Sequence, residues 1–388
     1  MIGTNHDPRL RETYLGKRVL VTGGFGFIGS HVTHELVELG AQVTVLDQST
    51  RPGRESLINL EEFGLRSRIT HTEGSVADSA LMRQLAGTGV YEHIFHFAAH
   101  ASVIEKAVAD PLATVQANTM GLVNLLEAVR QAPRQPDCIV HASTDKVYGD
   151  ADGEPYDEGK TALRGLGVYD STKLAADVFA RMYHEVFGLP TVVLRLCNIF
   201  GPHDFNTGYR LVPRSMRRLY DGDEPAPPEL YAESKDHYRD YLYIDDCVRA
   251  ILVVGACPEC RGEVFNLMGC CHLSTPEMCR CMVRIGEQVA REDDPQRADL
   301  IRRNDVAMTV SGQQSDVLTI GDQRSTGEKL RRATGFAPVI SLEEGLCRTA
   351  RAYRDYFRRQ GGRRNGQSAA NGRPSVTSLT PVDAPKLT

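Results

Sequence analysis

The sequence has no long hydrophobic run and no excess of basic residues. None of its apolar stretches approaches the ~20 residues that an α-helix needs to span a bilayer, which argues against a transmembrane helix. The formal charge is −5, from 45 basic and 50 acidic residues, so the basic stripe typical of nucleic-acid-binding proteins is missing. Residues 1–16 are polar and lack the apolar core of a signal peptide. We therefore expect a soluble cytoplasmic protein without a nucleic-acid or membrane partner.

The ten cysteines raise the question of a metal site or disulfides. In a cytoplasmic protein of this size, reduced thiols are more common than a disulfide framework. Possible zinc ligands cluster in one stretch, at Cys257, Cys260, Cys270, Cys271, His272, Cys279 and Cys281. Their spacing matches no standard zinc finger, and two cysteines two positions apart on a helix point to different faces. We expect structural thiols and no metal site.

Composition divides the chain into four regions. Residues 1–16 form a short polar lead, and residues 17–196 alternate apolar runs with helical patterns. Residues 197–357 have longer loops and a looser pattern. Residues 358–388 hold almost no large apolar side chain, so they cannot bury enough surface to offset their ordering entropy. We expect this last stretch to be a disordered tail.

The second region reads as repeated strand–helix units. Short apolar runs predict strands at residues 19–21, 43–46, 69–72, 93–97, 138–142 and 191–196. Apolar residues at helical spacing predict helices at 28–39, 79–85, 111–129 and 170–187. Alternating strands and helices form a parallel sheet that is covered on both faces. The predicted fold class is therefore α/β, a doubly wound Rossmann sheet with a smaller C-terminal α/β region.

A glycine-rich turn joins the first predicted strand to the first predicted helix. Its glycines are Gly23, Gly26 and Gly29. This spacing permits a tight turn and a close approach of the backbone to a pyrophosphate. The N-terminus of the helix that follows supplies unpaired N–H donors and a partial positive charge. The turn therefore predicts a dinucleotide-binding site.

Asp47 ends the second predicted strand, at the distance from the glycines that the dinucleotide motif requires. A carboxylate at this position accepts hydrogen bonds from the ribose hydroxyls and repels a 2′-phosphate. The sequence therefore favours NAD over NADP. Arg51 and Arg54 lie nearby and would tolerate a phosphate, which leaves NADP as the alternative.

Tyr169 and Lys173 lie four residues apart at the start of a predicted helix and so share one face. A lysine ammonium beside a tyrosine hydroxyl stabilises the phenolate and lowers the pKa of the tyrosine. We therefore expect Tyr169 to accept an alcohol proton during hydride transfer to a nicotinamide. The spacing carries weight only because it follows a dinucleotide fold.

Asp145 and Lys146 follow the predicted strand 138–142. Ligands of open parallel sheets bind at the carboxyl ends of the strands. A carboxylate and an amine side by side at such a place predict a general acid and a general base. The alternative is an ordinary surface ion pair in a loop.

Taken together, these motifs resemble the extended short-chain dehydrogenase/reductases that act on nucleotide sugars. The resemblance covers about residues 17–356. Its motifs are Thr22–Gly29, His96–Ala99, Asn118 with Gly121–Glu127, Ser143–Gly149, Tyr169–Lys173, Arg195 with Asn198, Gly201–Pro202 and Arg239–Asp246.

The pair after Thr144 separates the branches of that family. Asp145 and Lys146 resemble the version in CDP-glucose and inverting UDP-N-acetylglucosamine dehydratases, and the surrounding stretches most resemble the CDP-glucose 4,6-dehydratases. This resemblance implies an NAD-dependent hydro-lyase that makes a 4-keto-6-deoxy sugar. The resemblance implies that Tyr169 takes the C4 hydroxyl proton, that Lys146 removes the C5 proton and that Asp145 protonates the leaving C6 hydroxyl. A 4-epimerase or a decarboxylase on the same scaffold, or a non-catalytic nucleotide-binding protein, remains as an alternative.

The resemblance also implies the binding residues and a partner subunit. The implied catalytic residues are Thr144, Asp145, Lys146, Tyr169 and Lys173. The implied NAD contacts are Gly23, Gly26, Phe27, Ile28, Gly29, Asp47, Ser75, Val76, Phe97, Ala98, Ala99, Asn118, Tyr169 and Lys173. The implied nucleotide-sugar contacts are Ser102, Asn198, Arg210 and Arg239. Helices 111–129 and 170–187 resemble those that relatives pack between subunits, which implies a homodimer.

Overall fold

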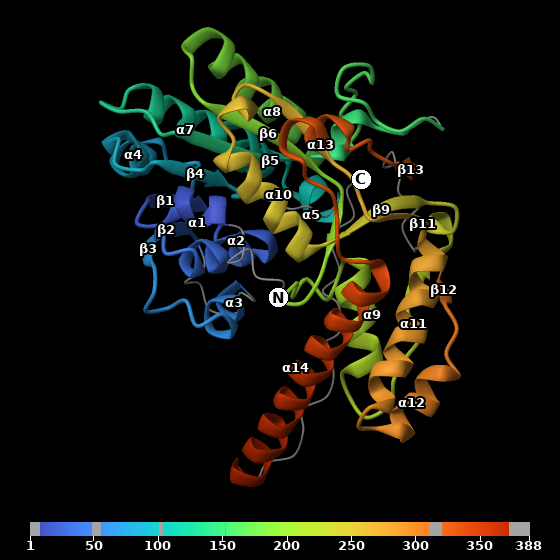
Figure 1. The fold of residues 1–388 in the computed structure, drawn as a ribbon. Coiled ribbons are helices and arrows are strands. Elements are labelled where there is room, and N and C mark those ends of the chain that lie inside the picture. Colours follow the sequence, from blue (N-terminus) through green and yellow to red (C-terminus); the bar gives the residue numbers. More distant parts are fainter. Residues whose placement is uncertain (1–7, 49–55, 101–103, 152, 310–319, 372–388) are drawn as a thin grey trace, which may run out of the picture.

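A seven-stranded parallel sheet forms the centre of the protein, in the order β10-β6-β5-β4-β1-β2-β3 (Figure 1). The computed structural model describes residues 8–48, 56–100, 104–151, 153–309 and 320–371. The strands of the sheet are β1 Arg18–Thr22, β2 Gln42–Asp47, β3 Thr70–Glu73, β4 His93–His96, β5 Cys138–Thr144, β6 Thr191–Leu196 and β10 Val264–Leu267. The predicted α/β fold class is confirmed, and six of these strands lie where apolar runs predicted them.

Helices cover both faces of the sheet. Alternating residues of β1 show the two layers, because Val19 and Val21 join one buried cluster and Leu20 joins the other. The first cluster packs under α2 Phe27–Glu38 and α10 Ile244–Ala256, and the second packs under α4 Ser79–Leu85, α7 Gly121–Arg130 and α8 Val168–Phe187. α3 Ser56–Glu62 packs beside α2.

The predicted helix 111–129 is interrupted. It consists of α6 Pro111–Val115, a five-residue π-helical segment Gln116–Met120, and α7. π-helical bulges are frequent at functional sites because they displace side chains from the regular helical face. Here the bulge carries Asn118, a predicted cofactor contact. α5 Ile104–Ala109, which precedes α6, was not predicted.

The smaller region is built on a second sheet, in which β9 Tyr238–Tyr243 pairs with β7 Asn198–Phe200, β11 Cys271–Ser274 and β13 Asp322–Gln323. β8 Glu229–Tyr231 and β12 Ala307–Thr309 form a separate pair. The helices here are α9 Leu211–Tyr220, α11 Thr275–Arg291, α12 Pro295–Arg302, α13 Glu328–Thr334 and α14 Leu342–Asn371. Short 3₁₀ turns occupy Ala86–Thr88, Asp145–Tyr148, Ala232–Ser234 and Pro258–Cys260. Because β10 and α10 return to the first sheet, the Rossmann layer draws on residues past 196.

Helices lie at both ends of the described chain. In the expected polar lead, α1 Pro8–Tyr14 buries Tyr14, whose hydroxyl donates to the Leu252 carbonyl. α14 extends past residue 358, where the disordered tail was expected to begin, and Arg358 and Arg359 form ion pairs with Asp293 and Glu62. Both ion pairs lie at the start of the expected tail, and counting apolar residues does not register them. Within the described residues, no helix is both long and apolar enough to cross a membrane.

Candidate functional site

In the glycine-rich turn, backbone segments approach one another too closely to admit side chains, as the dinucleotide motif requires. Gly23 has φ +71°, and a Cβ atom there would lie 2.7 Å from the Ala98 nitrogen. A Cβ at Gly29 would overlap the Gly23 carbonyl. Gly26 caps α2 in an extended conformation, so the first free N–H groups of that helix belong to Phe27 and Ile28. The turn therefore fits a dinucleotide pyrophosphate at the N-terminus of α2.

Asp47 lies at the end of β2, next to this turn. Its Oδ2 accepts a hydrogen bond from the Phe25 N–H at 3.0 Å, which fixes the carboxylate beside the glycines. This is the position from which an acidic side chain holds the adenosine ribose. Arg51 and Arg54 lie outside the described residues.

Five other predicted cofactor residues follow β3 and β4, at the same edge of the sheet as the glycine turn. They are Ser75, Val76, Phe97, Ala98 and Ala99. The hydroxyl of Ser75 accepts from the Ala77 N–H at 3.2 Å, so it shapes its own turn. Asn118 from the π-helical segment receives the His100 N–H at 2.7 Å and donates to Thr172 Oγ1 at 3.0 Å. Asn118 thereby joins the loop after β4 to α8.

A pocket of about 270 Å³ opens at the carboxyl ends of β5 and β6. Seven of the predicted site residues line it: Ile28, Thr144, Asp145, Lys146, Tyr169, Asn198 and Arg210. Ile28, from the N-terminus of α2, lines the same pocket, so the pocket adjoins the dinucleotide turn. The structure therefore brings the expected proton-transfer groups to one cavity beside the expected cofactor.

Asp145 and Lys146 begin the 3₁₀ turn that follows β5. Burial raises the pKa of Asp145 to about 7, and neighbouring Lys146 and Arg239 oppose that rise. Burial also lowers the pKa of Lys146, with Asp170 and Asp145 opposing. A carboxyl that keeps its proton near neutral pH suits a general acid, and a lysine that loses its proton more readily suits a general base.

Tyr169 and Lys173 lie one helical turn apart on α8, as the sequence predicts. Burial raises the pKa of Tyr169 to about 12, although Arg210 lowers it in part. Lys173 is buried and donates through Nζ to the Ala142 carbonyl, and burial lowers its pKa to about 8. Burial is the largest influence on the pKa of the Tyr169 hydroxyl in this structure, and the expectation that Lys173 lowers that pKa stays a prediction.

The predicted substrate residues differ in their placement. Asn198 presents a buried Nδ2 that has no protein partner within the described residues, and Arg210 forms an ion pair with Asp204 at 3.0 Å at the pocket wall. Arg239 does not line the pocket. Its guanidinium donates to the carbonyls of Ile320, Gly321 and Tyr238, so it holds β9 to the segment before β13. Ser102 lies outside the described residues.

Comparison with known proteins agrees with this geometry. Residues 19–267 match the NAD dependent epimerase/dehydratase family. The chain belongs to this family. NAD is therefore its cofactor, and the turn at Gly23 and the carboxylate of Asp47 form a site that fits it.

Relatives within the family carry two different activities in their names. The chain is 30% identical to UDP-glucuronate 4-epimerase 1 of Arabidopsis thaliana, over 88% of this chain and 78% of that one. It is 29% identical to a dTDP-glucose 4,6-dehydratase of Xanthomonas campestris, over 86% of this chain and 92% of that one. The structure of the dTDP-glucose 4,6-dehydratase DesIV of Streptomyces venezuelae was solved with NAD. It superposes on this chain with a TM-score of 0.72 at 28% identity, and the match covers 87% of this chain and 97% of DesIV. These relatives establish the family and leave the branch open.

Two contacts at the site were not predicted from the sequence. A buried ion pair between Asp177 and Arg195 lies behind β5, and Gln323 donates to Asp145 Oδ1 at 3.1 Å. Arg195 belongs to a motif that resembles the family, so the sequence could have indicated that this residue matters. The residues around Gln323 form no motif, so the sequence gives no indication that Gln323 contacts Asp145.

The cysteines within the described residues are all free thiols. Cys270 and Cys271 lie with their sulfurs 4.0 Å apart, while Cys260 and Cys279 are buried separately. Across the described part of the chain, no group of three or more His, Cys, Asp or Glu side chains is arranged to hold a metal ion.

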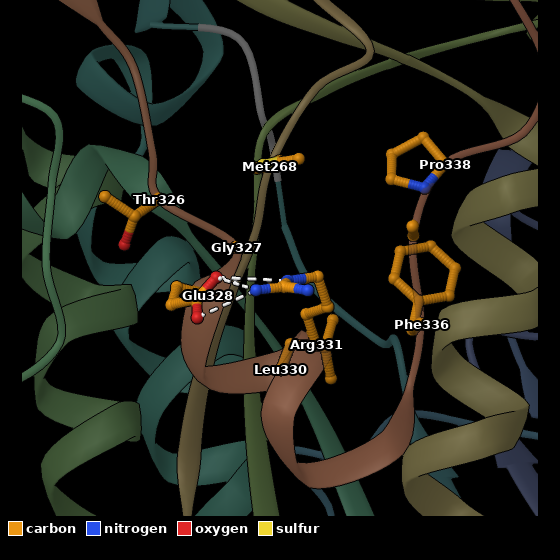
Figure 2. A pocket seen from close by; sticks show the side chains of 9 residues that line it. Met268, Thr326, Gly327, Glu328, Leu330, Arg331, Phe336 and Pro338 are labelled. Atoms are coloured by element: carbon orange, nitrogen blue, oxygen red, sulfur yellow. Dashed lines mark hydrogen bonds and ion pairs between the residues drawn. The ribbon is translucent and has the colours of Figure 1, made fainter.

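A second pocket, of about 230 Å³, lies beside α13 and is lined largely by apolar groups (Figure 2). Phe336 and Pro338 form one wall and Met268 another. Glu328 and Arg331 lie at its rim and pair with one another at 2.8 Å, as the dashed lines in Figure 2 show. This pocket shares no lining residue with the first one. Its charged groups neutralise each other, so we assign the chemistry to the first pocket.

Proposed function

We propose that the protein is an NAD-dependent nucleotide-sugar 4,6-dehydratase. It converts a nucleoside diphosphate hexose into the 4-keto-6-deoxyhexose by moving a hydride from C4 to C6. The observation that carries the proposal is the pair of Asp145 and Lys146 in the pocket with Tyr169, with one pKa raised and the other lowered by burial. An epimerase needs no acid and base at these two positions.

The first step is oxidation at C4. Tyr169 accepts the proton of the C4 hydroxyl, and Thr144 donates a hydrogen bond to the same oxygen. Bound NAD supplies the hydride acceptor and a positively charged ring. Because burial alone raises the pKa of Tyr169, the positive charges of Arg210 and of the cofactor are needed to favour the phenolate.

The second step is elimination of water across C5 and C6. The C4 ketone acidifies the C5 hydrogen, neutral Lys146 removes it as a proton, and Asp145 protonates the C6 hydroxyl as it leaves. The hydride then enters C6, and Lys146 returns its proton to C5. Tyr169 has gained one proton and Asp145 has lost one, so a proton exchange with solvent restores the enzyme and the net loss is one water.

The nucleotide-sugar contacts follow from the charges at the pocket wall. Arg210 suits a diphosphate oxygen, and the Nδ2 of Asn198 is a buried donor without a partner in the described structure. The resemblance of Asp145 and Lys146 to the CDP-glucose enzymes makes a CDP-hexose the first substrate to test. The relatives named above act on dTDP-glucose and UDP-glucuronate, so dTDP and UDP sugars follow.

A 4-epimerase is the second candidate, because UDP-glucuronate 4-epimerases are among the relatives of similar identity. It would use Tyr169 and NAD to oxidise C4 and would return the hydride to the opposite face of C4. Asp145 would then have no proton to deliver.

The experiment is incubation of the purified enzyme with CDP-, UDP-, GDP-, ADP- and dTDP-hexoses, followed by mass spectrometry. We expect one sugar to lose one water, and we expect Asp145→Asn to slow that loss by about 10²–10⁴-fold, the usual contribution of a general acid. Asp299→Asn, an exposed carboxylate on α12, serves as the control and should keep the full rate. An unchanged mass with a new isomer would establish the epimerase instead.

We also propose that the protein works as a homodimer that pairs through α6 and α8. Large apolar side chains lie exposed along these helices and the π-helical segment between α6 and α7, at Leu112, Val115, Met120, Val178, Phe179, Val186 and Phe187. Leu112 and Val186 are 66% and 64% exposed. Apolar surface gathered on neighbouring helices is typical of a subunit interface.

A further inference from the structure

Gln323 lies directly behind the carboxyl group of Asp145. It ends β13, where it pairs in register with Arg239 of β9, and its side chain is fully buried. Its Nε2 donates to Asp145 Oδ1 at 3.1 Å. Gln323 does not line the catalytic pocket, so it reaches Asp145 from the protein side. Residues that are 178 positions apart in the chain thus meet at the proposed general acid.

The two oxygens of the Asp145 carboxyl have different surroundings. Oδ1 receives a hydrogen bond from Gln323 Nε2. Oδ2 is buried and has no partner within the described residues. A proton placed on Oδ1 would face the Gln323 donor, whereas a proton on Oδ2 meets no donor within the described residues. This donor therefore favours the acid form that carries its proton on Oδ2.

We propose that Gln323 is a positioning residue that makes Oδ2 of Asp145 the oxygen that protonates the departing C6 hydroxyl. The inference rests on the proposed 4,6-dehydratase function. Gln323 orients the carboxyl and selects the oxygen, and it touches no reacting atom. In the step itself, the O–H bond at Oδ2 breaks, a new O–H bond forms on the C6 oxygen, and the C6–O bond breaks to release water.

Several ionisable groups also face Asp145. Lys146 lies next to it in the chain, Tyr169 faces it from α8, Tyr156 faces it from the loop after the 3₁₀ turn, and Arg239 and Asp240 face it from β9. Gln323 differs from all of these because it does not ionise. Its removal takes away a hydrogen bond without changing the net charge of the site.

The test compares Gln323→Leu, Gln323→Glu and wild type on the sugar that wild type dehydrates. Loss of one hydrogen bond to a charged or reacting group slows the elimination step by about 10–100-fold. Oxidation at C4 does not use Asp145, so Gln323→Leu should build up enzyme-bound NADH in a single turnover, with KM nearly unchanged. The control is Gln42→Leu. Gln42 is exposed and begins β2, at the edge of the sheet formed by the amino ends of the strands, so this variant should show no such build-up of NADH.

Gln323→Glu keeps the shape of the side chain and covers the case in which the leucine variant does not fold. A glutamic acid donates to Oδ1 only while it is protonated, so the elimination rate of this variant should rise more steeply with falling pH than that of wild type, in which, of these two residues, only Asp145 titrates. The proposal is overturned if Gln323→Leu folds and turns over like wild type, or if Gln323→Glu has the pH profile of wild type. If wild type itself releases no water from any nucleotide hexose, the dehydratase proposal fails before the variants are compared.

Discussion

Arg195 and Asp177 form a buried ion pair that joins β6 to α8 behind the catalytic loop. Arg195 Nε lies 2.8 Å from Asp177 Oδ2 and its second terminal nitrogen 3.1 Å from Oδ1, and both side chains are almost fully buried. Ser143 donates to the same carboxylate, and Arg195 also donates to the Tyr148 hydroxyl at 2.5 Å. This network fixes the strand that carries Thr144 and the helix that carries Tyr169 relative to each other.

Removal of one partner of this pair should destabilise the protein strongly. Asp177→Ala leaves the Arg195 charge buried and unpaired, which costs about 3–5 kcal/mol of unfolding free energy. The double variant Asp177→Leu, Arg195→Met should lose less than either single variant, because no charge remains buried. Urea unfolding measures the difference, and Asp299→Ala, from an exposed pair, should change it by less than ~1 kcal/mol. A double variant that is as unstable as the sum of the singles would contradict this account.

The two chemical steps should respond to pH in opposite directions. Asp145, with a pKa raised to about 7, is a competent acid only below that pH, so elimination slows as the pH rises through about 7. Tyr169 must lose a proton and has a pKa raised to about 12, so oxidation at C4 speeds up with rising pH. Single-turnover absorbance should therefore show more bound NADH at about pH 8.5 than at about pH 6. Equal NADH levels at both values would remove Asp145 from the acid role.

Asp47 should determine the choice of NAD over NADP. Asp47→Ala removes the acceptor for the ribose hydroxyls and the repulsion of a 2′-phosphate, so affinity for NAD should fall about tenfold or more and that for NADP should rise. Because Asp47 also accepts from Phe25 N–H, Asp47→Asn is the matched variant that keeps an acceptor oxygen for that contact. Titration of the two cofactors by calorimetry gives both constants. An unaltered ratio of NAD to NADP affinity in Asp47→Ala would show that another residue determines the preference for NAD.

The exposed apolar face on α6 and α8 should hold the subunits together. Val186→Glu places a charge in the proposed interface and should convert the dimer to monomer in light scattering coupled to size-exclusion chromatography. Val339→Glu changes a valine of similar exposure, 61%, on a distant loop and should leave the dimer intact. A wild-type protein that elutes as a monomer would show that this face has another use.

Most of the parallel sheet was predictable because its strands contain short apolar runs, as in Val19–Val21, whereas the buried strand β10 was missed. The glycine turn and Asp47 were predictable because their geometry is local. The contact of Gln323 with Asp145 was not, because it joins distant segments through a tertiary fold. The carbonyl partners of Arg239 were missed for the same reason. The raised pKa of Tyr169 could not be predicted either, because it results from burial, which the spacing of residues along a helix does not reveal.

The most direct test of the central claim is to follow a deuterium label placed at C4 of the nucleotide hexose that the enzyme consumes. Internal hydride transfer predicts a 4-keto-6-deoxy product that has lost one water and carries the deuterium at C6, which NMR locates. A product of unchanged composition with the deuterium still at C4 would contradict the dehydratase account and identify the protein as an epimerase.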